Sequence, residues 1–152
     1  MRWTPFVTVA AIAQRGDQFL VVEERADGAL VFNQPAGHVE RDETLVEAVR
    51  REVLEETGWD FEPQSVVGVY LYTSPQPDVS YLRVCFAGQC LLHHPDRPLD
   101  EGIVHAPWMS RDQLVREQAR LRSPLVLRCI DDYLAGRNHP ISLLTHILLP
   151  LR

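Results

Sequence analysis

The sequence predicts a mixed β-sheet packed between helices, in a fold of α+β or α/β type. Three observations indicate this class. Strand-like segments occur both before and after one amphipathic helix, further helical segments gather toward the C-terminus, and the 152 residues suit one domain with its own core. We therefore expect a single domain over residues 1–152, with its core at about 5–136 and an apolar tail at 137–152.

The first third of the chain predicts strands that lead into a helix. We expect a β-hairpin from 6–13 and 18–24 around Arg15-Gly16-Asp17, a polar loop at 25–30 and a short extended segment at 31–35. Thr44 followed by Glu47 is typical of a capping box, and Gly58 supplies the left-handed residue after a helix end. These signals predict a helix over 45–57.

The rest of the chain predicts further strands and then helices. A connection at 59–64 precedes strands at 65–72, 80–92 and 103–109, with loops at 73–78 and 93–100. Helices are expected from the N-cap Ser110 to about 117, and from Ser123-Pro124 to Gly136. The apolar tail at 141–151 packs either on the domain or on a second subunit.

Composition excludes several classes of protein. The formal charge of −6 argues against stable nucleic-acid binding, which usually needs a basic surface. All fifteen basic residues are arginine, which excludes a Walker lysine, a Schiff-base lysine and a Ser–Lys dyad. No apolar run reaches the roughly 18 residues of a membrane span. Three cysteines without C-x-x-C spacing favour a reduced, cytoplasmic protein.

Three carboxylates gather on one face of the predicted helix. Glu52, Glu55 and Glu56 stand three and four residues apart, so they repel one another, and two lie at the unfavourable end of the helix dipole. Clustered carboxylates suit a hard cation such as Mg²⁺ or Mn²⁺. Taken alone, the Glu55–Glu56 pair is more typical of a solvated helix face.

The surrounding stretch favours the metal site. GHVERDETLVEAVRREVLEETGW, from Gly37 to Trp59, has Gly37, Glu43 and the run Arg51–Gly58 at the spacing of the Nudix box, so the chain resembles the Nudix hydrolases. Trp59 is the one departure, since the family more often has an aliphatic residue there. The resemblance implies an α/β/α sandwich with the box helix on one side of the sheet, and Mg²⁺- or Mn²⁺-dependent attack of water on a diphosphate linkage.

The resemblance also implies roles for individual residues. Glu52 acts as general base, and Arg51 orients the glutamates by charge-assisted hydrogen bonds. Glu43 and Gly58 are expected to be structural. The expected metal ligands are the Gly37 carbonyl, Glu52, Glu55, Glu56 and an acid from beyond the box, for which Glu101 is preferred over the neighbouring Asp100.

Three residues outside the acidic group are expected to contact substrate, namely Arg122, Arg83 and His38. For Arg122 and Arg83, a surface position without such a role is an equal alternative.

Segments outside the box resemble one branch of the family, the NudJ-type phosphatases. They are FLVVEE at 19–24, NQPAGHVE at 33–40, DETLVEA at 42–48 and RSPL at 122–125. That branch hydrolyses hydroxymethylpyrimidine pyrophosphate and nucleoside di- and triphosphates. Alternatives are a MutT-like housecleaning triphosphatase, a nucleoside-diphosphate-sugar pyrophosphatase, and a non-catalytic Nudix domain that senses nucleotides. The expected partner is a small phosphoanhydride substrate, and no association with a membrane is expected. The protein is expected to be a monomer or a homodimer.

Overall fold

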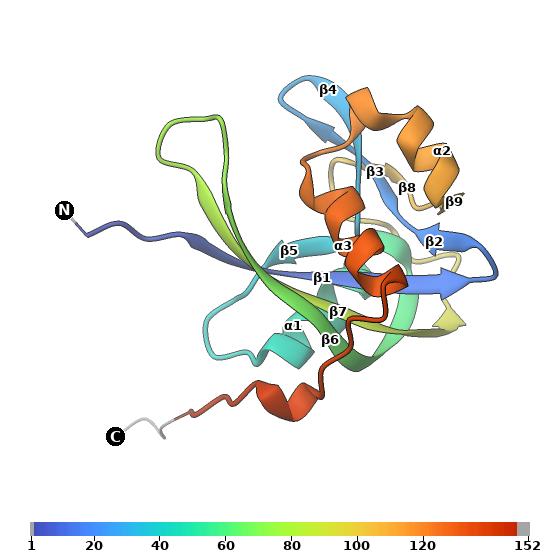
Figure 1. Ribbon diagram of the computed structural model, residues 1–152. Coiled ribbons are helices and arrows are strands. Elements are labelled where there is room, and N and C mark those ends of the chain that lie inside the picture. The colour runs from blue at the N-terminus through green and yellow to red at the C-terminus, as the bar shows by residue number, and fades with distance from the viewer. Residues whose placement is uncertain (1, 149–152) are drawn as a thin grey trace.

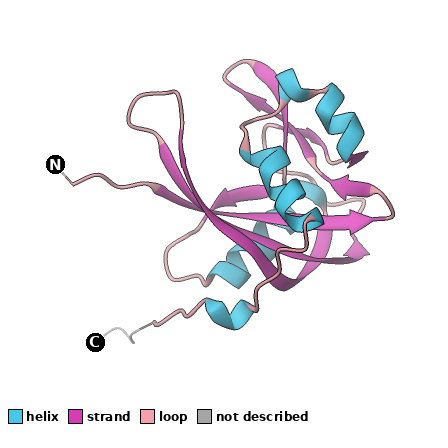
Figure 2. Cartoon of the chain, viewed as in Figure 1, coloured by secondary structure: helices cyan, strands magenta, loops and turns pink. Residues whose placement is uncertain are grey.

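The computed structural model describes residues 2–148 and contains two β-sheets with helices packed against them (Figures 1 and 2). The strands are β1 (Phe6–Arg15), β2 (Gln18–Leu20), β3 (Val22–Ala26), β4 (Ala29–Asn33), β5 (Ala36–His38), β6 (Trp59–Thr73), β7 (Ser80–His93), β8 (Ile103–His105) and β9 (Trp108–Ser110). The helices are α1 (Leu45–Thr57), α2 (Arg111–Arg116), α3 (Leu125–Leu134) and the 3₁₀ turns η1 (Gln118–Arg120) and η2 (Ile141–Leu143).

The larger sheet is mixed, as predicted. Its strand order is β6-β7-β1-β2-β9, and β5 also pairs with β1. Strand β1 runs parallel to β7 and antiparallel to β5, while β6 and β7 form a long antiparallel hairpin. The smaller sheet has the order β4-β3-β8. The expected mixed sheet between helices is therefore confirmed.

Strand β1 is buried on both of its faces, which explains its continuous apolar sequence. Val9, Ala11 and Ala13 belong to the cluster that contains Val49 and Val53 of α1. The alternate residues Ala10 and Ile12 belong to a second cluster, with Cys129 and Ile130 of α3. Helix α3 crosses in front of the sheet in Figure 1, and α1 lies on the opposite face. One hydrophobic cluster thus lies between α1 and the sheet, and the other lies between α3 and the sheet.

Helix α1 has the boundaries that the capping signals predict. The Thr44 hydroxyl accepts a hydrogen bond from the Glu47 amide at 3.1 Å, and Glu47 Oε1 accepts one from the Thr44 amide at 2.9 Å. At the other end Gly58 has φ 76°, and its amide donates to the Leu54 carbonyl. The predicted capping box and left-handed terminus are both confirmed.

Two predictions for the first part of the chain are corrected. The pairing of β1 with β2 covers only Gln14↔Phe19 and Arg15↔Gln18, because β7 and β5 occupy the edges of β1 along most of its length. The expected polar loop at 25–30 is instead the turn of the β3–β4 hairpin. Asp27 and Gly28 both have positive φ there, which closes a tight connection.

Two predictions for the second part are also corrected. The expected connection at 59–64 is the first portion of β6, where the register shifts between Pro63 and Ser65 let proline enter a strand. The expected strand at 103–109 is split at Ala106-Pro107. Its first half, β8, joins the small sheet, and its second half, β9, joins the large one.

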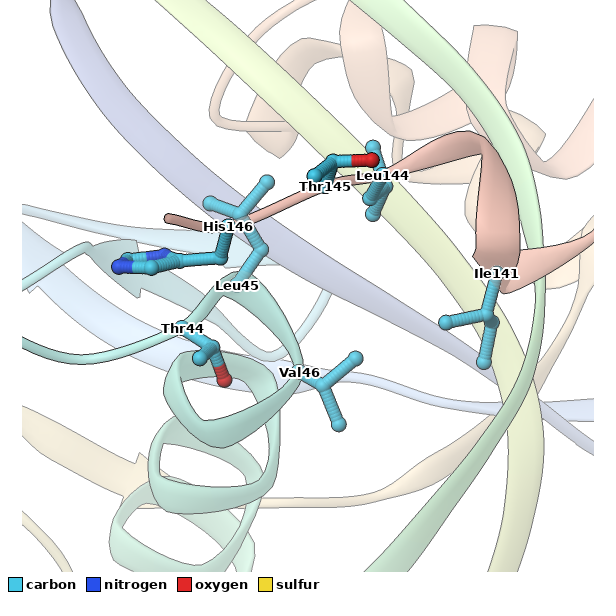
Figure 3. Close-up of a pocket in the computed structure, with 7 residues that line it drawn as sticks. All are labelled: Thr44, Leu45, Val46, Ile141, Leu144, Thr145 and His146. Atoms are coloured by element: carbon cyan, nitrogen blue, oxygen red, sulfur yellow. The ribbon is translucent and has the colours of Figure 1, made fainter. Parts of the chain in front are cut away.

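The C-terminal tail packs on the domain over the part that the structure describes. Ile141 and Leu144 contact the core on the α1 side, and they line a cavity of about 240 Å³ with Leu45 and Val46 (Figure 3). Leu143 and Ile147 are exposed. Residues 149–152 lie outside the described range, and packing on a second subunit stays a prediction. None of the described helices is both long and apolar enough to cross a membrane.

Candidate active site

The acidic face of α1 lies directly against β5. Glu52 and Glu56 are buried and Glu55 is half-buried. A Cβ atom on Gly37 would lie 2.1 Å from Glu52 Cδ and 2.3 Å from each carboxylate oxygen. The Glu52 carboxylate therefore occupies the space that a side chain at position 37 would fill. Gly37, which the sequence singled out, brings the carboxylate of Glu52 against the backbone of β5.

Burial disfavours the charged form of the two carboxylates at this contact. The Ala36 amide donates to Glu56 Oε1 at 2.9 Å. Even so, burial raises the pKa of Glu56 to about 9, and the nearby Glu52 carboxylate contributes to the rise. Burial also raises the pKa of Glu52 to about 7, against the opposing effect of Arg51. Carboxylates in such a setting are stabilised by a cation, and oxygen donors suit Mg²⁺ or Mn²⁺.

One acid from beyond the box joins the cluster. Oxygen atoms of Glu52, Glu55 and Asp100 all lie within 4.8 Å of one another. The structure places Asp100 in this group and not Glu101, which corrects the preference for Glu101. The reason is a backbone contact, because the Asp100 amide donates to the Glu55 carbonyl at 2.9 Å and fixes the loop to the last turn of α1.

Arg51 connects the acids to one another. Its Nε and Nη2 donate to the two oxygens of Glu43 at 2.9 and 2.7 Å, which is a bidentate pair. Its Nη1 donates to Glu52 at 2.8 Å and to Glu55 at 3.3 Å, and Nη2 also reaches the His38 carbonyl at 3.0 Å. The hydrogen bonds from Arg51 lower the pKa of Glu43. This geometry agrees with an orienting arginine and a structural Glu43.

The structure places the three expected substrate contacts in different settings. Arg122 is exposed, and its Nη1 pairs with Glu24 Oε1 at 3.0 Å. His38 is exposed and follows Gly37 directly. Arg83 is buried, with 5% of its surface accessible, so the alternative of a surface position is wrong for it.

Sequence reasoning missed the partners of two of these arginines. Glu24 pairs with Arg122, and its charge adds to the rise in the pKa of Glu56. Asn33 and Gln34 hold Arg83. Both sets belong to the segments FLVVEE and NQPAGHVE, but nothing in the local pattern relates them to arginines about 50 to 100 residues away. Their contacts depend on how the strands are paired.

Trp59, the departure from the usual box, also has a structural explanation. Its ring stacks on His93 with centroids 4.5 Å apart, and the Arg15 guanidinium lies 4.8 Å from the ring centroid. Trp108 completes the group at 6.0 Å. The larger side chain therefore packs between the ends of β6, β7 and β9 and leaves the acidic face unchanged.

Comparison with known proteins agrees with this geometry. The model of the Nudix domain matches residues 4–128, so the chain belongs to the Nudix family. Phosphatase NudJ of Escherichia coli strain K12 is 39% identical over 140 residues, which cover 92% of this chain and 90% of that protein.

Two solved structures extend the comparison. A Nudix hydrolase from Nitrosomonas europaea is 46% identical, with a TM-score of 0.91 and coverage of 95% of this chain and 98% of that one. An ADP-ribose pyrophosphatase from Streptococcus suis is 25% identical, with a TM-score of 0.67 and coverage of 88% and 93%. The protein is thus a Nudix hydrolase of phosphoanhydrides, a family that generally uses a divalent metal ion.

Proposed function

We propose that this enzyme is a Mg²⁺- or Mn²⁺-dependent phosphatase of nucleoside di- and triphosphates or of hydroxymethylpyrimidine pyrophosphate. The observation that carries the proposal is the convergence of Glu52, Glu55 and Asp100 within 4.8 Å. The 39% identity to a NudJ phosphatase across nine-tenths of both chains supports the substrate class.

The residues in this cluster fit a divalent ion because they offer only hard oxygen donors. Glu52, Glu55, Glu56, Asp100 and the Gly37 carbonyl would hold it. When bound, the ion neutralises phosphate oxygens and lowers the pKa of a nearby water.

Glu52 is the proposed general base. Its carboxylate accepts a proton from the attacking water, and the contact with Gly37 holds it against β5 beside the other acids of the cluster. Arg51 holds that carboxylate at 2.8 Å, which fixes the direction in which it accepts the proton. The deprotonated water then attacks phosphorus and the leaving phosphate departs. In such phosphoryl transfers the rate enhancement comes mainly from positioning and electrostatic stabilisation.

Contacts to the substrate are proposed for Arg122, His38 and Arg83. Arg122 is exposed, and its Nη1 pairs with Glu24 Oε1 at 3.0 Å. A substrate phosphate there would compete with Glu24 for Arg122.

Other functions remain alternatives to test. A housecleaning triphosphatase and a nucleoside-diphosphate-sugar pyrophosphatase would use the same acids with different substrates. A nucleotide sensor of the family would be expected to lack a box carboxylate, whereas this chain retains all of them. The complete box favours the enzyme.

The wider assignments are also part of the proposal. We expect one domain, a monomer or homodimer, and no stable binding of nucleic acid, since the formal charge is −6. A cytoplasmic location is proposed from the three free cysteines, two of which are buried.

The test is an assay of the purified protein with Mg²⁺ or Mn²⁺ on a panel of pyrimidine pyrophosphates, nucleoside di- and triphosphates and nucleotide sugars. Release of orthophosphate supports the phosphatase, release of pyrophosphate the triphosphatase, and release of a sugar phosphate the sugar pyrophosphatase. No release from any compound would refute the enzyme.

A matched pair of variants tests the proposed ligand set. Asp100→Asn should lower kcat at least about 10-fold, because it removes a charge from the cluster. Glu101→Gln, one residue further along the same loop, should leave it unchanged. Equal rates for the two variants would contradict a role for Asp100.

A further inference from the structure

Arg83 is a buried cation with mostly neutral neighbours. Its Nη1 donates to Gln34 Oε1 at 2.9 Å and its Nη2 to Asn33 Oδ1 at 3.3 Å. Among residues 2–148 no carboxylate lies within ion-pair distance of it. Buried charges are normally paired with an opposite charge. The positive charge of the Arg83 guanidinium is therefore not fully compensated, and it can bind an electron-rich ligand.

The remaining neighbour of Arg83 is the Cys129 thiol, whose sulfur lies 3.8 Å from Nη1. Cys85, together with the Arg83 cation, lowers the pKa of Cys129 to about 7. A long contact to one nitrogen balances the guanidinium only in part, and it leaves Nε and Nη2 without an anionic partner.

The orientation of Arg83 is fixed, with one donor left open. Gln34 Nε2 donates to the Val126 carbonyl at 2.7 Å, so the Gln34 amide oxygen is held toward Arg83. Nε of Arg83 has no hydrogen bond to the described residues. Within that part of the chain, no side-chain nitrogen or oxygen sealed from solvent lacks a partner. Nε of Arg83 therefore retains contact with solvent.

An aromatic surface adjoins this donor. Tyr81 stands two residues before Arg83 on β7, so both side chains project from the same face of the sheet. The Phe6 ring lies 5.1 Å from the His38 ring and 5.9 Å from the Tyr81 ring. Phe6 is 48% exposed, and His38 is exposed as well. Strand pairing places these rings beside Arg83, because Thr8 lies opposite both Arg83 and His38.

This aromatic surface lies on the opposite face of β5 from the acidic cluster, because successive residues of a strand point to opposite faces and Gly37 is turned toward Glu52. His38 follows Gly37, which lies against the carboxylate of Glu52, and the His38 carbonyl accepts a hydrogen bond from Arg51. A substrate whose diphosphate group lies at Glu52 and Asp100 can thus reach this surface by extending its organic end around β5, which pairs only with β1 among the described strands.

We propose that Phe6, His38, Tyr81 and Arg83 form the subsite for the heteroaromatic ring of the substrate. The ring stacks on the aromatic side chains, and an acceptor at its edge, a carbonyl oxygen or ring nitrogen, takes a hydrogen bond from Arg83. Stacking accepts any flat ring, whereas the arginine selects rings with an acceptor at that edge. The inference rests on the proposed function and adds the residues that select the organic group.

The experiment compares two phosphoanhydrides that differ in the ring. Steady-state kinetics are measured with UDP and with inorganic tripolyphosphate, which has no ring. Arg83→Met, which keeps the length of the side chain but removes its donors, should raise the KM for UDP at least about 10-fold. The KM of this variant for tripolyphosphate should stay within about 2-fold of the wild-type value, because the contacts to the phosphates are unchanged.

Phe6 is exposed and Tyr81 is half-buried, so substitutions there disturb folding less than a change at the buried Arg83. Phe6→Leu and Tyr81→Leu should each raise the KM for UDP about 5- to 10-fold through lost stacking, with kcat little changed. Arg116→Gln, on the exposed surface of α2, is the matched control and should match the wild type with both substrates. Thermal unfolding shows which variants fold.

Each outcome decides the inference. Equal changes for UDP and tripolyphosphate in Arg83→Met would assign Arg83 a purely structural role and overturn it. If that variant does not fold, an unchanged KM for UDP in both leucine variants overturns it. If the wild type hydrolyses neither compound, the full substrate panel decides the proposed function, and calorimetry with UMP without metal decides the subsite. If the wild type binds UMP and the leucine variants do not, the subsite is supported. If the wild type does not bind UMP, the subsite is refuted.

Discussion

Gly37 leaves the Glu52 carboxylate in contact with the backbone of β5, because any larger residue would overlap Glu52 Cδ. The contact removes Glu52 from water, while Arg51 keeps one of its oxygens hydrogen-bonded. At the residue scale, the reactivity of each carboxylate depends on how far it is removed from solvent. Glu56 is buried to the same extent as Glu52, and Glu55 keeps part of its solvation.

Gly37→Ala should lower kcat by about 10²-fold, since displacement of a reacting group by about 1 Å has an effect of that size. The added methyl group pushes the Glu52 carboxylate out of place, while helix α1 and its caps are untouched. Activity assays and thermal unfolding of the same preparation check this. A variant that unfolds at the wild-type temperature with wild-type kcat would show that the close approach has no catalytic role.

Glu56→Gln should abolish most activity, at least about 100-fold in kcat, if Glu56 holds the metal. Without metal, the same variant should be more stable than the wild type at pH 8. The pKa of Glu56 is about 9 in the folded protein against a usual value of 4.5. Between these values the folded state retains a proton that the unfolded state has lost, so wild-type stability falls as pH rises.

The stability gain of Glu56→Gln should therefore shrink from pH 8 toward pH 5. Unfolding by urea in the presence of a chelator, at several pH values, measures it. A gain that is constant with pH would mean that Glu56 does not titrate in this range. A second series with excess Mg²⁺ should favour the wild type, because the ion binds the charged carboxylate.

At the scale of elements, the β6–β7 hairpin determines how the sheet curves around α1. Register shifts in β6 at Trp59/Phe61, Pro63/Ser65 and Val66/Gly68 bend the strand against a continuous β7. Gly88 lies at one of these points, and a Cβ atom there would be 2.1 Å from the Glu62 carbonyl oxygen. The bulge requires glycine on the partner strand.

Gly88→Ala should destabilise the protein by about 1–3 kcal/mol, because the clash is with backbone that cannot rotate away. Denaturant unfolding measures the change. Gln89→Ala, at the exposed neighbouring position, is the control and should stay within about 0.5 kcal/mol. Equal stability of the two variants would show that the strands separate at little cost.

At the scale of the whole molecule, segments far apart in the chain complete the acidic site and the core. The loop after β7 brings Asp100 to α1, and the tail returns to pack beside the start of the same helix (Figure 1). The tail also pairs with β6, where Val66 and His139 exchange two backbone hydrogen bonds.

Leu144→Ala should destabilise the protein by about 1 kcal/mol, as expected for a half-buried leucine. Leu143→Ala should have almost no effect, because 59% of that side chain is exposed. Thermal unfolding at one protein concentration compares the two. A larger effect of Leu143→Ala, together with a melting temperature that rises with concentration, would instead indicate that the tail packs on a second subunit.

The local signals predicted most of the elements. Thr44, Glu47 and Gly58 gave the ends of α1, and the family pattern marked the acids on its face. Misassigned segments were those whose conformation depends on distant partners, such as 59–64 in β6 and 103–109, which divides between two sheets. No motif fixes the register of the loop that contains Asp100 and Glu101, so the sequence could not distinguish the two acids.

The sequence by itself determined the family, the box helix and its acids, because these depend on residues close together in the chain. Only the tertiary structure decided that Asp100 joins the acids and that Arg83 is buried beside Asn33 and Gln34. Those contacts are made across strands and loops, and no local pattern records which strand lies next to which.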